Sequence, residues 1–100
     1  MAILEEHAAA SVALDIGAGR GALVIYPAER YRGREIEISR AGSPRRVHTG
    51  VHERRTHSGG VLSAIFGSLE AGEYRIWEDA QTCGPDVVIA DGAVAEIVLL

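Results

Sequence analysis

Three histidines in the middle of the chain have a side chain suited to metal binding, because an imidazole nitrogen is a common ligand of transition metals. They are His48, His52 and His57, and the single cysteine, Cys83, could approach them from another loop. On a helix, the four-residue spacing of His48 and His52 would allow both to bind one ion. On a strand, the same spacing places them about 13 Å apart, which is too far. A metal site is therefore one candidate, and histidines exposed on a hydrated β face are the alternative.

The only tryptophan, Trp77, is a candidate for binding another protein. Between residues 73 and 78, Tyr74 and Ile76 alternate with Arg75 and Trp77, so a strand here directs Trp77 away from the core. An exposed Trp beside an Arg is typical of an interface anchor. The alternative is that Trp77 packs beneath the polar loop that follows it.

Charge is unevenly distributed along the chain. Residues 30–55 contain eight Arg and three acids, a balance of +5, whereas residues 56–100 contain one Arg and seven acids, a balance of −6. One interpretation is that the two halves pair across strands, with Glu35 and Glu37 meeting Arg46 or Arg54. The other is a basic face that docks an acidic partner or a second copy. The expected contact face carries Trp77, Arg75, Arg46, His52 and Arg54.

The totals exclude several classes of function. A net charge of −4 argues against a general nucleic-acid binder. No segment approaches the ~20 apolar residues of a membrane span. One cysteine allows no intramolecular disulfide, and the N-terminus carries acids where a signal peptide has basic residues, so we expect a cytoplasmic protein. No nucleophile with a neighbouring base is recognisable, and no cofactor is expected.

Alternating apolar residues predict seven or eight short strands with a turn about every ten residues. Residues 61–69 also fit a helical stripe, but we favour a strand over 61–66, ended by Gly67. Asp91-Gly92 predicts a two-residue hairpin turn. A tail over residues 1–10 is expected to precede a single domain over 11–100. The predicted strands are 11–17, 22–26, 34–40, 45–54, 61–66, 73–78, 87–90 and 93–100.

Three stretches carry a family likeness. Residues 33–38 read Gly-Arg-Glu-Ile-Glu-Ile, residues 56–60 read Thr-His-Ser-Gly-Gly, and residues 66–76 read Phe-Gly-Ser-Leu-Glu-Ala-Gly-Glu-Tyr-Arg-Ile. Together with the last predicted strand, they resemble the prealbumin-like β-sandwiches, a group that includes carboxypeptidase regulatory-like and collagen-adhesin B-type domains. The resemblance implies an all-β, antiparallel Greek-key β-sandwich of seven to eight strands. It also implies a spacer, adhesion or accessory role.

The sequence therefore favours a non-catalytic module that binds a protein partner or associates with itself. A metal-binding protein using His48, His52 and His57 is the first alternative. An enzyme of the prealbumin-like fold is the second, and it would need a concave pocket in which titratable groups converge.

Overall fold

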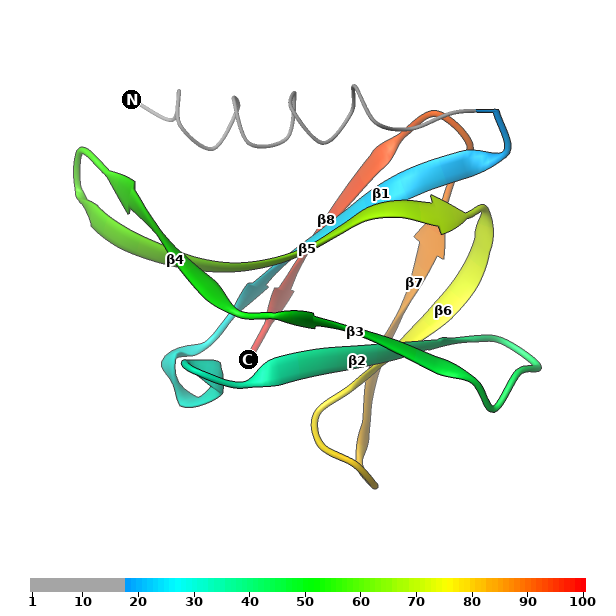
Figure 1. Cartoon of the computed structure of the whole chain (residues 1–100), viewed down its shortest axis with the longest axis horizontal. Coiled ribbons are helices and arrows are strands. Elements are labelled where there is room, and N and C mark those ends of the chain that lie inside the picture. Colours follow the sequence, from blue (N-terminus) through cyan, green and yellow to red (C-terminus); the bar gives the residue numbers. More distant parts are fainter. Residues whose placement is uncertain (1–17) are drawn as a thin grey trace.

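The computed structural model describes residues 18–100, which form two four-stranded sheets (Figure 1). The first sheet has the strand order β4–β5–β1–β8 and the second has the order β3–β2–β6–β7. The predicted tail over residues 1–10 and the predicted strand over 11–17 lie outside the described residues. In chain order the elements are β1 (Arg20–Pro27), the 3-10 turn η1 (Glu29–Tyr31), β2 (Glu35–Arg40), β3 (Arg46–Gly50), β4 (His52–Thr56), β5 (Gly59–Glu70), β6 (Gly72–Trp77), β7 (Cys83–Ile89) and β8 (Val94–Leu99).

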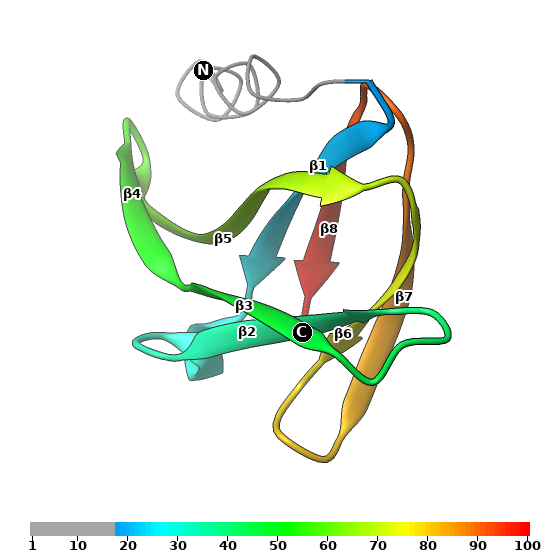
Figure 2. The same ribbon diagram turned by 45° about the vertical axis from the view of Figure 1, so that its right-hand side comes forward.

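The inner faces of the two sheets enclose one core, and Figure 2 shows the two sheets as separate layers. The strand alternation predicted from the sequence is confirmed for β2 and β6, where Ile36, Ile38, Tyr74 and Ile76 are buried. Burying one large aliphatic side chain contributes about 1.5–3 kcal/mol, so this alternation is the main reason that the strands form. No helix in residues 18–100 is long and apolar enough to cross a membrane.

Residues 61–69 are strand rather than helix, and the strand does not end at Gly67. It continues to Glu70, because the pairing with β1 accommodates Gly67 in an irregular register. Phe66 and Leu69 of β5 are three residues apart, whereas their partners in β1, Leu23 and Gly21, are two residues apart. The extra residue is a β-bulge, which turns Leu69 to the same inward face as Phe66. The helix-like spacing of these apolar residues is therefore the signature of a bulged strand.

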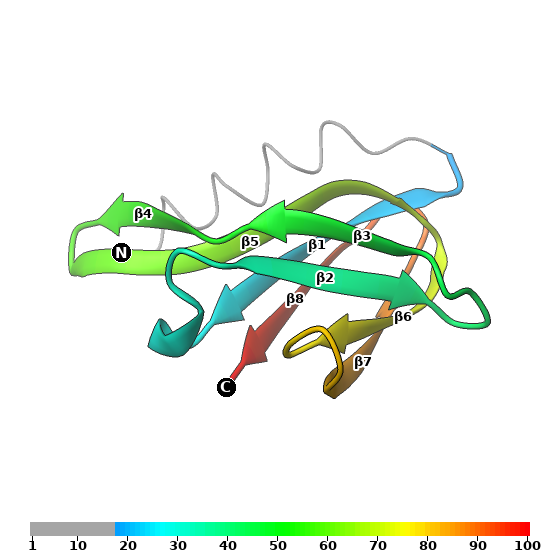
Figure 3. The ribbon, with the colours of Figure 1, turned by 60° about the horizontal axis from the view of Figure 1, so that its bottom comes forward.

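The predicted strand over residues 45–54 is wrong in one respect, because the extended chain changes sheets at Val51. β3 pairs with β2 in the second sheet, whereas β4 pairs with β5 in the first. Figure 3 shows the two strands following nearly the same line. At the crossing, the N–H of Val51 donates to the carbonyl of Arg34 at 3.0 Å, and the Val51 side chain is buried in the core.

The Asp91-Gly92 turn is present, but the predicted hairpin is not. β7 pairs with β6 in the second sheet, and β8 pairs with β1 in the first, so the turn connects two layers. Gly92 has a φ of 72°, and its N–H donates to the carbonyl of Arg20 at 2.8 Å. The β1–β8 pair is also parallel, which departs from the antiparallel arrangement expected throughout.

Gly21 is required where β1 passes the β7–β8 connection. A Cβ at this position would collide with the carbonyl oxygen of Ala90 and would lie 2.9 Å from that of Ala93. We expect Gly21→Ala to lower the free energy of unfolding by about 1–3 kcal/mol, because backbone must move to admit the methyl group. Gly67→Ala is the matched control, since a Cβ there meets nothing within 4 Å. Urea unfolding of both variants measures the difference, and equal losses would contradict the steric explanation.

Candidate functional site

Trp77 lies half-buried on the outward face of the second sheet, as its position between Arg75 and the polar loop predicts. Its indole Nε1–H donates to Ser39 Oγ on β2 at 2.9 Å. The guanidinium of Arg46, from β3, stacks 3.7 Å from the centre of the indole ring. A cation over an aromatic face contributes about 0.5–2 kcal/mol, depending on solvation. Two neighbouring strands therefore fix the orientation of the indole.

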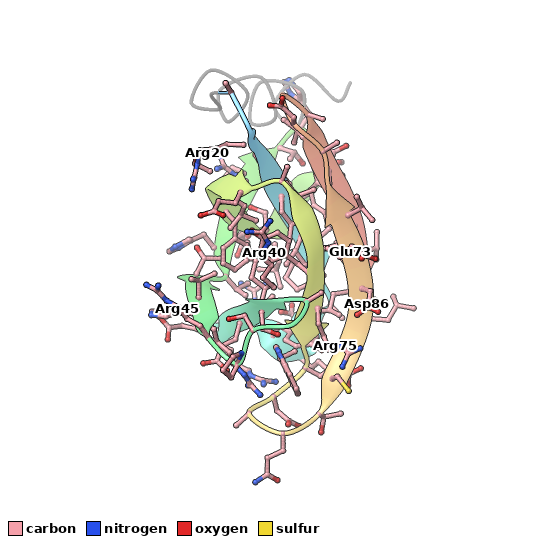
Figure 4. All side chains as sticks on the ribbon, turned by 90° about the vertical axis from the view of Figure 1, so that its right-hand side faces the viewer. Arg20, Arg40, Arg45, Glu73, Arg75 and Asp86 are labelled. Carbon is pink, nitrogen blue, oxygen red and sulfur yellow. The ribbon has the colours of Figure 1, made fainter. Side chains whose placement is uncertain are left out.

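Ion pairs across strands surround Trp77. Arg46 Nη1 lies 2.9 Å from Glu37 Oε1, so the cross-strand pairing predicted for Glu37 and Arg46 is confirmed. The pairing predicted for Glu35 is wrong, because Glu35 contacts His48 instead. On the other side, Arg75 Nε lies 3.1 Å from Asp86 Oδ1, and this hydrogen bond raises the pKa of Arg75 (Figure 4). We use the term Trp77 face for the outward side chains of Glu37, Ser39, Arg46, Arg75, Trp77 and Asp86.

Two shallow hollows adjoin Trp77. The first, of about 310 Å³, has Ser39 and Trp77 in its wall and contains two guanidiniums and two carboxylates, those of Arg40, Arg75, Glu73 and Asp86. The second, of about 270 Å³, contains one guanidinium and four carboxylates, those of Arg34, Glu35, Glu37, Glu78 and Asp79. Trp77 thus separates a hollow of balanced charge from an acidic one.

The structure brings together three of the five residues predicted to share one contact face. Arg46, Arg75 and Trp77 are neighbours, whereas His52 and Arg54 lie on β4 in the other sheet. The Nε of Arg54 donates to Ser63 Oγ at 3.2 Å, away from Trp77. This separation follows from the change of sheet at Val51, because residues before and after the crossing belong to different layers.

The histidines are distributed over three structural elements. His48 is on β3 with its Nδ1 3.1 Å from Glu35 Oε2, His52 is on β4, and His57 is in the turn before β5. Cys83 is exposed at the start of β7, paired across the sheet with Trp77. Among residues 18–100, no three His, Cys, Asp or Glu side chains are grouped so that they could hold a metal ion. The metal-binding alternative therefore gains no support from the described part of the chain.

The roles of two residues beside Trp77 could not be recognised from the sequence alone. The alternation over residues 34–40 predicts that Ser39 points outward with Glu35 and Glu37, yet it is 8% exposed beneath the indole. Asp79 Oδ1 accepts the N–H groups of Gln81 and Thr82 at 2.8 and 2.7 Å, and these bonds lower the pKa of Asp79. Such an aspartate turn organises the β6–β7 loop beside Trp77.

Comparison with known proteins shows a likeness of fold. A solved structure of a leucine-rich repeat protein from Bacteroides thetaiotaomicron VPI-5482 is similar to this chain with a TM-score of 0.53 and 16% sequence identity. The likeness covers 82% of this chain and 12% of that chain, so this chain corresponds to a small part of a much longer one. No protein-family model and no curated protein matches the sequence.

The depressed pKa of Asp79 predicts a dependence of stability on pH. Because the pKa is lower in the folded state, the charge stabilises the fold above the unfolded value of about 3.9, and this contribution is lost as the pH falls through the folded value. Asp79→Asn retains a side-chain oxygen that can accept the two N–H bonds but removes the charge. We expect the variant to be less stable than the parent at pH 7, and the gap to narrow towards pH 2. Urea unfolding across this range tests it, and a gap independent of pH would contradict it.

Proposed function

We propose that this chain is a non-catalytic protein-binding module, built as a prealbumin-like β-sandwich of the carboxypeptidase regulatory-like type, which docks a partner protein on the Trp77 face. The observation that carries the proposal is the indole of Trp77, held half-exposed between two hollows by Ser39 and Arg46.

Orientation of the indole before binding supports an anchoring role. Trp and Arg are the residue types most enriched among those that dominate binding energy. A side chain that is already fixed loses little rotational freedom when a partner arrives, so less of the contact energy is spent on ordering it. The stack of Arg46 on Trp77 and the bond from Trp77 to Ser39 provide that fixation.

The pairing of charges on this face supports binding rather than catalysis. Arg46 is engaged by Glu37, and Arg75 by Asp86. Paired groups present a fixed pattern of charge, and complementary patterns give an interface its specificity. A partner that fits would place an apolar group on Trp77 and a basic side chain towards the acidic hollow.

The likeness to part of a longer protein supports an accessory role. The similar region makes up 12% of the chain of the leucine-rich repeat protein, so the same fold serves there as one unit among others. A fold that makes up a small part of a longer chain is consistent with an accessory role such as the proposed docking module.

Replacing Trp77 and Arg46 together by alanine is expected to abolish partner binding while preserving the fold. Removal of an anchor of this type costs about 2 kcal/mol or more of binding free energy, equivalent to a loss of affinity of at least thirtyfold. The measurement is quantitative mass spectrometry of proteins retained from an extract of the native cells by the immobilised parent and the variant. Circular dichroism and thermal unfolding establish that the variant is folded.

Arg54→Ala is the matched control, because Arg54 is an exposed arginine on the other sheet that bonds Ser63 Oγ. We expect it to retain the proteins that the double variant loses. If the double variant retains the same proteins in the same amounts as the parent, the Trp77 face is not the binding surface.

A further inference from the structure

β8 is an open edge of the first sheet. It pairs with β1 on one side, and among residues 18–100 no strand pairs with its other side. Near the Asp91-Gly92 turn β7 runs close by, but the two strands belong to different layers (Figure 2). Val98, near the end of β8, is 63% exposed, and Leu100, just after the strand, is 84% exposed.

The other three edge strands carry features that discourage pairing with another chain. β4 has the consecutive charged residues Glu53, Arg54 and Arg55. β3 carries Arg46 and His48. β7 contains Gly84-Pro85-Asp86 and an irregular register against β6. Charged side chains, proline and bulges are the usual protection of sheet edges against association.

β8 lacks this protection. It reads Val-Ala-Glu-Ile-Val-Leu, without proline, glycine or a basic residue. Its one charged side chain, Glu96, accepts a hydrogen bond from Tyr26 Oη at 2.8 Å, within the same sheet. A regular, apolar and exposed edge is a template for an added strand.

The backbone of β8 determines which groups an added strand would meet. The carbonyls of Ala93 and Leu99 accept hydrogen bonds from Ala22 and Ala28, at 2.9 and 2.8 Å, on the β1 side. Backbone groups in a strand alternate in direction, so the even-numbered residues present their N–H and C=O groups to the open edge. These residues are Val94, Glu96 and Val98.

We propose that two copies of this chain form a symmetric dimer by antiparallel pairing of β8 with β8 of the partner copy. With even-numbered residues facing each other, one register places Glu96 opposite Glu96 of the second copy, which like-charge repulsion disfavours. A shift by two residues places Glu96 opposite Val98 of the second copy, and this register avoids the repulsion. The edge can therefore pair with a second copy of itself without opposing two carboxylates.

Such a dimer is independent of the proposed binding function, because the Trp77 face lies on the other sheet. A dimer of this kind would present two Trp77 faces, one on each copy. Binding of both to a partner with repeated sites would increase the apparent affinity without new contacts.

Substitutions at Val98 test both the edge and the register. In the proposed register, Val98→Glu places a carboxylate opposite Glu96 of the second copy, whereas Val98→Lys places an ammonium there. We expect the parent to be dimeric, Val98→Glu to raise the dissociation constant by about tenfold or more, and Val98→Lys to stay closer to the parent. Sedimentation equilibrium over a range of concentrations measures all three. Val88→Glu is the matched control on β7, since Val88 is 64% exposed, and it should behave as the parent.

Three results would overturn the proposal: a parent that stays monomeric into the millimolar range, a Val98→Glu variant that associates as the parent does, or equal weakening by Glu and Lys. If Val98→Glu or Val98→Lys does not fold, a disulfide test with the smaller, uncharged cysteine replaces it. In a Cys83→Ser background, Glu96→Cys and Val98→Cys chains are mixed under oxidising conditions. A preferred disulfide between the two different chains supports the register, and its absence refutes it.

Discussion

The hydrogen bond from Val51 N–H to the Arg34 carbonyl, together with burial of the Val51 side chain, holds the chain where it crosses between the two sheets. Residues before this point extend the second sheet beside β2, and residues after it extend the first sheet beside β5. Both sheets thereby reach four strands and can cover one core. The same crossing decides which polar side chains share a face, because it separates Arg46 from Arg54 although the sequence alternation alone would align them.

The alternation of apolar residues was sufficient to predict which side chains of β2 and β6 enter the core, because one face of each strand is buried. In β1 both faces are buried, so alternation gives no signal there. The overall pattern of short apolar runs and turns predicted an all-β fold. Which strands pair with each other was harder to predict. An extended run looks the same whether it stays in one sheet or changes sheets at Val51, and Asp91-Gly92 favours a tight reversal whether or not its flanking strands pair. Pairing is determined by long-range packing, which local sequence does not encode. The β-bulge in β5, by contrast, is visible in the local sequence. It gives Phe66 and Leu69 a three-residue spacing, which on its own is typical of a helix.

Parity also predicted the outward direction of Trp77 and its proximity to Arg75. The stack of Arg46 on the indole and the burial of Ser39 beneath it could not be predicted, because they depend on the register between β2, β3 and β6. Charge segregation along the chain gave a partial signal. The basic segment 30–55 and the acidic segment 56–100 do meet in Arg30–Glu78 and Arg40–Glu70. The two ion pairs beside Trp77, Arg46–Glu37 and Arg75–Asp86, each lie within one segment. The sequence thus shows which residue types are available for the Trp77 face, but the pairing register of β2, β3 and β6 determines which of them become neighbours.

The parallel pairing of β1 with β8 has a consequence for how the chain folds. Ala22 lies opposite Val94, so this contact joins residues at the two ends of the described fold. A contact of such large sequence separation incurs its loop-closure entropy before it is stabilised by packing, which slows folding. During synthesis, β1 can pair with β5 before β8 has been made, so the other edge of β1 is still unpaired at that stage. The first sheet therefore gains its complete form late, and until then β1 itself is an exposed apolar edge that chaperones or neighbouring nascent chains can bind.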